Sequence, residues 1–191
     1  MQRTSLGYAL LGLLQENPAS GYDVRKIFSA TSMKSYSDSP GAIYPALARL
    51  EKQGLVRGKI EQGSGLRRRQ LFHVTPKGLG ELKKWICRPI TRDDLVARQP
   101  EIVLRFAFCD KAAGPAASVE FLHSLRSALA PYIDSLHQEM ESMGKLMPTS
   151  ARLAFEGGIR GAEGFLTWTN DAIATYEKLG FAKQSTKGSA S

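Results

Sequence analysis

Cysteine, histidine and long apolar runs are all scarce in this chain of 191 residues. The two cysteines, Cys87 and Cys109, have no metal-type spacing and are too few for a disulfide framework. We therefore expect half-buried thiols in a reducing compartment. No apolar run approaches the ~20 residues of a membrane span, and the N-terminus lacks the small-residue cleavage site of a signal peptide. These absences predict a cytoplasmic protein without a membrane partner.

Patterns that support catalysis or metal binding are also missing. His123 and His137 lie about 21 Å apart if they share one helix, so they cannot bind one metal ion. The Asp93-Asp94 pair has no third ligand nearby in the sequence and is better explained as a solvated linker or a helix cap. The glycines of residues 157–161 follow no strand, so they indicate close packing or a helix defect, not a phosphate-binding loop. We expect that the protein is not an enzyme and that it has neither a cofactor nor a metal site.

The positive charge is concentrated in the first half of the chain. Residues 1–90 contain 15 Lys and Arg against 6 Asp and Glu, a balance of +9, whereas residues 91–191 contain 11 against 12, a balance of −1. A basic domain beside a neutral one indicates that the first half meets a polyanion.

Three helices are predicted in the first 54 residues. Their starts are marked by hydroxyl side chains that can act as N-caps, at Thr4 or Ser5, at Ser20 and at Ser39, and the last of these precedes Pro40, which suits a first helical turn. Apolar residues then recur every three or four positions. Gly54 is expected to end the third helix.

A hairpin and a fourth helix are predicted next. Residues 55–60 and 69–75 alternate as strands around a Gly63–Gly65 turn, and Thr75-Pro76 begins a helix that Pro89 ends. This order is the winged variant of the helix-turn-helix design. We expect a mainly α protein with an N-terminal winged helix-turn-helix, which has a two-stranded wing, and a helical C-terminal dimerisation domain.

The third helix and the wing have residues suited to DNA. The helix start can bind phosphate through backbone N–H groups, and polar side chains follow on its outer face. The arginine triplet directly after the hairpin turn, with Lys59 across from it, suits a minor groove; alone, it could equally be a solvated tip. The expected DNA contacts are Ser39, Pro40, Gly41, Ala42, Tyr44, Arg49, Lys59, Arg67, Arg68 and Arg69.

The C-terminal half is expected to dimerise. We predict a DNA-binding domain over 1–88, a linker over 89–100, a helical domain over 101–180 and a flexible tail over 181–191. One long apolar seam, which Pro131 should kink or split, needs a partner surface that a second chain can provide. The alternative is packing within one chain. The expected interface is Phe121, Leu125, Leu129, Tyr132, Leu136, Met140, Met143 and Met147.

Aromatic residues of this half could line a pocket for a small effector. Trp168, flanked by two threonines, is the expected ligand contact; helically spaced aromatics are also common in a plain core.

A resemblance to a known family follows from these residues. The stretch SPGAIYPALARLEKQGLV at 39–56 resembles the signature of the PadR family of bacterial regulators, and Ser20–Asp23 and Thr75–Gly78 are similar to it as well. The match is dense over 4–86 and looser beyond, where LRFAFCD at 104–110 and two helices resemble the larger-bodied subgroup. The wing departs from the family pattern, because Gln70 and His73 replace basic residues.

The resemblance implies a homodimer that represses, or less often activates, nearby promoters and responds to small effectors such as phenolic acids. It implies that Tyr44, Arg49 and Arg67–Arg69 touch DNA and that the C-terminal seam dimerises. We expect an inverted-repeat operator with half-sites about 34–36 Å apart. Two alternatives remain: a winged-helix module that binds protein or RNA, and an architectural DNA binder. Localised charge on the third helix and wing opposes the first, and the large neutral body opposes the second.

Overall fold

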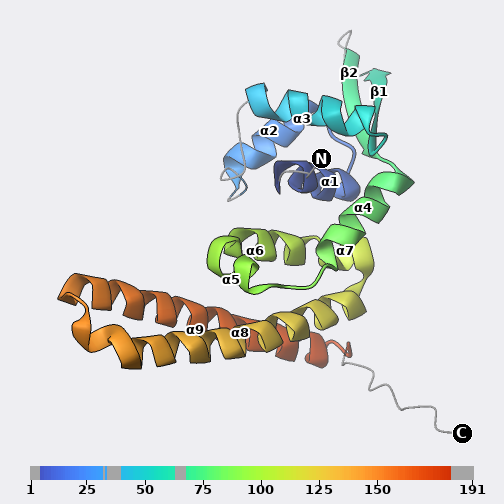
Figure 1. Ribbon diagram of the computed structural model, residues 1–191. Coiled ribbons are helices and arrows are strands. Elements are labelled where there is room, and N and C mark those ends of the chain that lie inside the picture. Colours follow the sequence, from blue (N-terminus) through green and yellow to red (C-terminus); the bar gives the residue numbers. More distant parts are fainter. Residues whose placement is uncertain (1–4, 32, 34–39, 63–67, 182–191) are drawn as a thin grey trace, which may run out of the picture. The chain divides into compact units, whose positions relative to one another are not determined.

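The computed structural model describes residues 5–31, 33, 40–62 and 68–181, and these are mainly helical with one two-stranded antiparallel sheet (Figure 1). The elements are α1 (Ser5–Glu16), α2 (Gly21–Ala30), α3 (Pro40–Lys52), β1 (Val56–Gln62), β2 (Arg68–Val74), α4 (Pro76–Ile86), α5 (Arg92–Ala97), α6 (Gln99–Ala107), α7 (Cys109–Ala113), α8 (Pro115–Met143), η2 (Gly144–Leu146) and α9 (Thr149–Lys178).

The chain forms two compact units. The first, here called the winged-helix unit, combines residues 1–88 with residues 107–113. The second, here called the helical unit, combines residues 89–106 with residues 114–191. The chain therefore passes between the units three times.

Two of the predicted caps, Ser20 and Thr75, lie in the described part of the winged-helix unit, and both are present. Ser20 and Asp23 form a capping box at the start of α2, and the Thr75 side chain accepts a hydrogen bond from the Gly78 N–H at the start of α4. Gly54 follows α3 with a φ of 70°, the left-handed conformation expected of a residue that ends a helix. These local signals confirm the predicted order of three helices, hairpin and helix.

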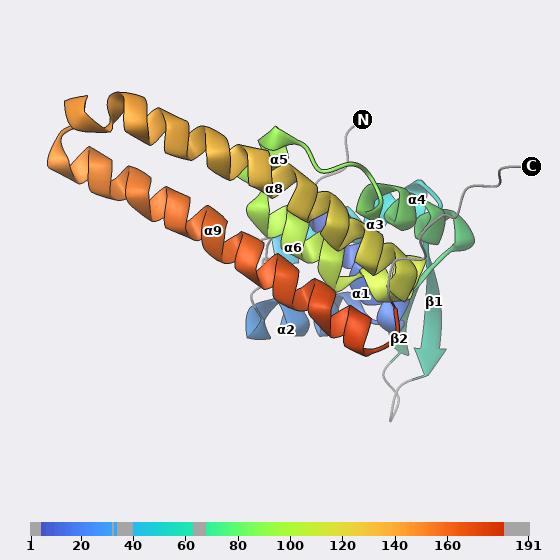
Figure 2. The same ribbon diagram turned by 90° about the horizontal axis from the view of Figure 1, so that it is seen from below.

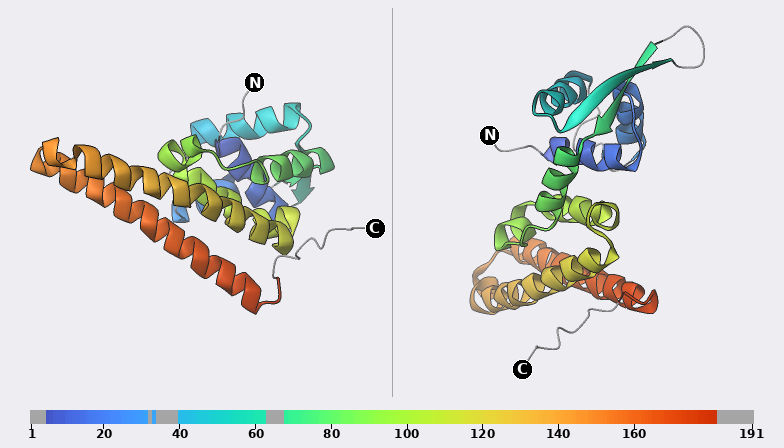
Figure 3. Two further views of the ribbon diagram at one scale, coloured as in Figure 1. Left: turned by 60° about the horizontal axis from the view of Figure 1, so that its bottom comes forward. Right: turned by 90° about the vertical axis from the view of Figure 1, so that its right-hand side faces the viewer.

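The core of the winged-helix unit is the apolar face of α1 packed against α3, α4 and β2. The strands pair in a continuous register from Val56 opposite Val74 to Gln62 opposite Arg68, and the hairpin projects away from the helices (Figure 3). Two backbone hydrogen bonds between Ala19 and Phe72, at 2.9 and 3.4 Å, fasten β2 to the segment before α2. The base of the wing is thus held on the helices.

The short helix α7 completes this unit from beyond its expected boundary at 88. Phe108 lies directly beside Gly12 of α1, where a side chain on residue 12 would collide with its ring. The Gln15 amide donates a hydrogen bond to the Phe108 carbonyl, and Lys111 pairs with Glu16 at 3.6 Å. Cys109 is buried here.

The two thiols were predicted to be half-buried, and that prediction was wrong. Cys87 is exposed at the end of α4, whereas Cys109 is fully buried. The difference follows from the location of each residue. Cys109 is a buried residue of α7, which packs in the winged-helix unit, whereas Cys87 is the C-cap residue of α4.

Helix α5 lies within residues 89–100, which we expected to form a linker. Thr91 and Asp94 form a capping box, with the Thr91 N–H donating to the carboxylate at 3.0 Å. The Arg98 Nε donates to the other oxygen of Asp94 at 2.9 Å, so this fully buried carboxylate is well supplied with donors. Of the two readings of the Asp93-Asp94 pair, the helix cap is therefore correct.

In the helical unit α8 and α9 form a long antiparallel hairpin that turns through η2 (Figure 2). We expected Pro131 to kink or split α8; it does not split the helix, which continues from Pro115 to Met143. Pro131 is on the exposed side of α8, so packing of the opposite side along α9 can hold the helix together despite one missing N–H.

An aromatic cluster fills the space between α6, α8 and α9. Phe106 of α6 lies 5.9 Å from the Phe121 ring and 5.5 Å from the Trp168 ring, measured between centroids. The guanidinium of Arg105 is fully buried and lies 5.1 Å from the centre of the Phe121 ring. Adjacent residues of α6 thus contribute a cation and a ring to one apolar core.

Candidate nucleic-acid interface

The outer face of α3 presents the polar side chains predicted for it. Tyr44 is 49% exposed, and Gly41 and Arg49 are also exposed, whereas Ala42 is half-buried. Pro40 is the first residue of α3, as predicted, but its side chain and the whole of Ser39 lie outside the described residues.

The wing differs in one respect from the prediction. Lys59 is exposed but pairs with Leu71, and the residue opposite Arg69 is Glu61. Lys59 is therefore not across from the arginine triplet, because the pairing of the strands continues beyond it to Gln62 opposite Arg68. Arg67 and the Arg68 side chain are outside the described part.

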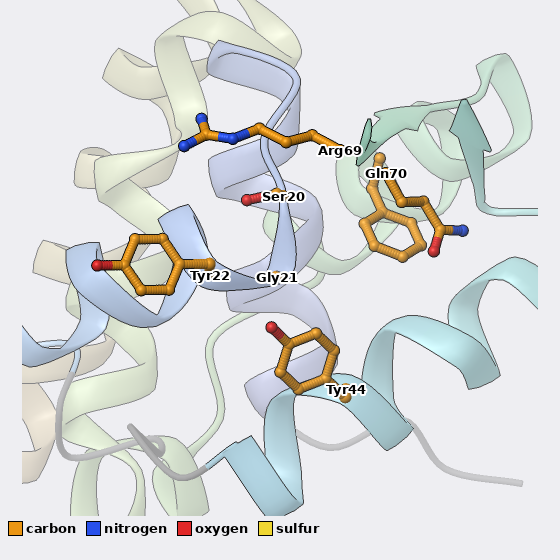
Figure 4. Close-up of a pocket in the computed structure, with 7 residues that line it drawn as sticks. Ser20, Gly21, Tyr22, Tyr44, Arg69 and Gln70 are labelled. Carbon is orange, nitrogen blue, oxygen red and sulfur yellow. The ribbon is translucent and has the colours of Figure 1, made fainter. Parts of the chain in front are cut away.

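A pocket brings two of the predicted residues together with residues that sequence reasoning missed. It has a volume of about 570 Å³ and is formed by the start of α2, the outer face of α3 and strand β2. Figure 4 shows Tyr44 directed toward the start of α2 and Arg69 extending past Ser20. The lining residues are Ser20, Gly21, Tyr22, Tyr44, Arg69, Gln70 and Phe72.

Gly21 allows this arrangement. A Cβ on residue 21 would lie 2.5 Å from the Cε1 atom of Tyr44, closer than any real side chain could stand. Glycine at the first position of α2 therefore lets the ring of Tyr44 lie against that helix. The sequence did contain a signal, since Ser20–Asp23 was identified as a helix start, but nothing in it indicated which side chain would lie against Gly21.

The electrostatics of this region depend on Asp23. The Ser20 hydroxyl donates to its Oδ2 atom at 2.6 Å and the Ser20 N–H donates at 3.1 Å. This hydroxyl hydrogen bond is the largest cause that lowers the pKa of Asp23 below its ordinary value of 3.8, and the charges of Arg69 and Lys26 act in the same direction, against a smaller rise from burial. Asp23 is thus ionised at neutral pH and attracts Arg69.

Part of the predicted dimer seam is buried within a single chain. Phe121, Leu125 and Leu129 are 0–6% exposed within the α8–α9 hairpin and its neighbours. The alternative of packing within one chain accounts for these three residues, since α9 offers the nearer apolar face. Tyr132, Leu136, Met140 and Met147 are half-buried, and Met143 is 50% exposed.

Trp168, the expected effector contact, belongs to the aromatic cluster. It is half-buried, stacks on Phe165 at 5.4 Å and meets Phe106 edge-on. An effector contact and an ordinary core residue, the two roles considered for Trp168, would both place its ring in this cluster.

The described residues were also expected to lack a metal site and a membrane span. Within residues 5–31, 33, 40–62 and 68–181, His, Cys, Asp and Glu nowhere gather in a group of three that could hold a metal ion. No helix of this part of the chain has the length and apolar character to cross a bilayer.

Comparison with known proteins gives sequence matches to one family. The model described as the transcriptional regulator PadR-like family matches residues 10–84. Over 185 residues the chain is 25% identical to the negative transcriptional regulator PadR of Bacillus subtilis (strain 168), covering 91% of this chain and 98% of that protein.

Solved structures give weaker likenesses. Bacillus subtilis PadR in complex with operator DNA is similar at 19% identity, covering 92% of this chain and 99% of that one, with a TM-score of 0.46. Bacillus subtilis PadR in complex with p-coumaric acid matches at 18% identity, 91% and 99% coverage, and a TM-score of 0.42. The comparison rests on the sequence matches: residues 10–84 match the transcriptional regulator PadR-like family, and the chain is similar to a PadR regulator over most of its length.

Proposed function

We propose that this protein is a sequence-specific DNA-binding repressor, without enzymatic activity, that acts as a homodimer on an inverted-repeat operator. The observation that supports it most is the pocket where the recognition helix meets the wing. Tyr44 and Arg69, both predicted from the sequence to touch DNA, line this one pocket and are exposed. A basic, largely donor-bearing surface formed by two elements fits a duplex.

In this proposal α3 and the wing contact different parts of the duplex. Gly41, Tyr44 and Arg49 lie on the exposed side of α3, which would enter the major groove. Arg69 and Lys59 would contact the backbone or minor groove from the wing. The proposal extends to Ser39, Pro40, Ala42, Arg67 and Arg68, which the sequence places at the start of α3 and the tip of the wing.

A competition titration by fluorescence anisotropy at physiological salt tests the function. The probe is DNA from immediately upstream of the protein's own gene, and the competitor is a scrambled duplex of equal length. Non-specific binding alone reaches a Kd of ~10⁻⁴–10⁻⁶ M, so preference must be measured. A preference of about a thousandfold supports the regulator. Equal affinity for the scrambled duplex and for fragments selected from the whole genome would favour an architectural binder.

We propose that the homodimer forms through the outer surface of the α8–α9 hairpin. Large apolar side chains remain exposed near its turn: Met143 is 50% exposed, Leu146 84% and Leu153 55%. Exposed apolar clusters of this kind are typical of association surfaces. Leu153→Glu is expected to shift the species in sedimentation from dimer to monomer, whereas Leu179→Glu, at an exposed leucine at the other end of α9, should leave it dimeric. A monomeric wild type would exclude this part of the proposal.

We further propose an aromatic carboxylic acid as the effector, bound beside the aromatic cluster. The buried Arg105 guanidinium provides positive charge, and Phe106, Phe121 and Trp168 provide ring faces. A panel of aromatic acids and their uncharged amides would be titrated against the protein–operator complex. Release by acids, not by amides, and loss of that release in Trp168→Leu, are expected; release by neither would contradict the proposal.

A further inference from the structure

The wing, residues 56–74, contains one acidic residue and one histidine, and the structure brings the two together. The Nε2 atom of His73 in β2 lies 3.6 Å from the Oε1 atom of Glu61 in β1. We propose that this pair makes DNA binding pH-sensitive, because protonation of His73 offsets the Glu61 carboxylate and strengthens binding as the pH falls. This rests on the proposed DNA-binding function and adds a form of regulation to the same surface.

The strand register places the pair on one face of the wing. His73 lies opposite Arg57, and Glu61 lies opposite Arg69. Since side chains alternate along a strand, these four residues share one face of the hairpin. The His73 side chain is 30% exposed and that of Glu61 50%. The ring can therefore exchange protons with water while part of the pair is shielded from it, which strengthens the attraction between opposite charges.

The neutral ring is incompletely satisfied. In the described part of the chain, the buried Nε2 atom of His73 makes no hydrogen bond. A protonated imidazole carries an N–H on both nitrogens and a positive charge, so it would give this atom an ionic partner in Glu61. Histidine is the side chain whose charge ordinarily changes between about pH 5 and 8. The pair is therefore strongest on the acid side of this range.

Other ionisable groups near β2 leave Glu61 as the carboxylate available to His73. In α1, Glu16 pairs with Lys111, and in α2, Asp23 accepts two hydrogen bonds from Ser20. Arg57, directly opposite the ring, opposes a second positive charge there. The ionisable residues of the strand and helices that pack on β2 are Arg57, Lys59 and Glu61 in β1, Tyr8 and Glu16 in α1, and Tyr22, Asp23, Arg25 and Lys26 in α2.

Protonation of His73 changes the charge of an element that is proposed to contact DNA. Residues 56–74 include five Lys and Arg and one Glu, so the wing carries +4 with neutral His73 and +5 with charged His73. While the ring is neutral, the Glu61 carboxylate repels phosphates and attracts the wing arginines. Once the ring is charged, the carboxylate is offset and the wing attracts a duplex more strongly.

His73→Gln, compared with His137→Gln, tests the response. The control histidine also pairs with a glutamate, Glu163 at 2.9 Å, but lies in the helical unit. Duplex binding is titrated by anisotropy at about pH 8 and about pH 5.5 at constant ionic strength. Wild type and His137→Gln are expected to bind about three- to tenfold more tightly at the lower pH, and His73→Gln to lose this response. An unchanged response in His73→Gln would overturn the proposal.

His73→Lys separates charge from shape. A lysine is charged at both pH values, so this variant should bind at pH 8 about as tightly as wild type does at pH 5.5 and should respond little to pH. If the ring acted only through packing, lysine would not restore what glutamine loses. Binding by His73→Lys that matches His73→Gln at both pH values would therefore overturn the proposal.

Glu61→Gln tests the acidic partner. Loss of the carboxylate removes its repulsion of phosphates, so this variant should bind more tightly than wild type at pH 8, by about three- to tenfold. At pH 5.5, where His73 already offsets the carboxylate, the gain should be smaller. A gain of the same size at both pH values would show that Glu61 acts independently of His73 and would overturn the pair.

Salt and sequence dependence separate this proposal from the proposed function. Because the effect is electrostatic, the pH response should be the same on the upstream duplex and on the scrambled one, and log Kd should depend more steeply on log salt at pH 5.5 than at pH 8, by up to about 0.9. A wild type without sequence preference would contradict the proposed function and leave the pH response intact. Equal salt slopes at the two pH values, or a response confined to the upstream duplex, would overturn the proposal.

Discussion

Two glycines of the winged-helix unit and the four glycines of α9 in the helical unit have opposite surroundings. In the winged-helix unit, Gly12 and Gly21 each lie against an aromatic ring, Phe108 and Tyr44 respectively, that any larger residue would strike. In α9 of the helical unit, four glycines have no atom within 4 Å of the position that a Cβ would take: Gly157, Gly158, Gly161 and Gly164. Gly12 and Gly21 make room for aromatic side chains of the same chain, whereas the four glycines leave one side of α9 without side chains at these positions.

This contrast shows why a residue type alone does not determine packing. The glycines of residues 157–161 were predicted to mark close packing or a helix defect, yet α9 is continuous from Thr149 to Lys178 and no residue that the structure describes packs on them. The glycines that do pack closely were identified only by what lies beside them. The predictions below use this difference between the units.

The largest expected effect is in the helical unit. Leu125→Ala should lower the free energy of unfolding by about 2–5 kcal/mol, because the side chain is fully buried and its removal leaves a cavity. Leu153→Ala, at an exposed leucine, should change it by less than about 0.5 kcal/mol. Chemical denaturation measures both. A stable but monomeric Leu125→Ala protein would restore Leu125 to the dimer interface.

The winged-helix unit should be sensitive at Gly12. Gly12→Ala is expected to destabilise by about 1–3 kcal/mol, because the added methyl group competes with the Phe108 ring for space. Phe108→Leu in the same background should recover part of this loss by freeing space. Thermal unfolding followed by circular dichroism reports both, and a Gly12→Ala protein as stable as wild type would show that α7 is not docked on α1 in solution.

The capping box should give a smaller, pH-dependent effect. Asp23 has a lowered pKa in the folded state, so its stabilisation is complete above its ordinary value of 3.8 and fades as the pH falls through the folded pKa. Asp23→Asn is expected to cost about 1 kcal/mol at pH 7. Denaturation at a series of pH values should show the gap closing below about pH 4; the exposed Asp171→Asn serves as control.

The smallest effect should have the opposite sign. Gly157→Ala is expected to stabilise the protein by about 0.5–1 kcal/mol, because alanine suits a helix interior better and its methyl group meets no neighbour among the described residues. A loss of stability together with a shift toward monomer in sedimentation would indicate that a second chain packs on this side of α9.

Local chemistry explains what the sequence could predict. Ser20, Thr75 and Gly54 determine the backbone conformation within a few residues of their own positions, so the helix boundaries and the hairpin could be predicted from them. The exposed polar positions on α3 followed from helical spacing. Neither depends on contacts between residues far apart in sequence.

The missed features all depend on such long-range contacts. No pattern near Phe108 indicates that it docks on Gly12, 96 positions earlier. The seam of α8 was correctly identified as apolar, but whether α9 or another chain covers it is decided by tertiary packing. The part played by Ser20–Tyr22 in the pocket emerged only when α2, α3 and β2 came together.

The docking of α7 has a consequence for dissecting the protein. A fragment that stops at Arg88 would contain every element of the winged helix and still lack the Phe108 ring beside Gly12 and the Lys111 partner of Glu16. Its α1 would expose an apolar surface to water. The smallest complete unit is therefore discontinuous, and a fragment designed for isolated study should carry residues 107–113 grafted back onto it.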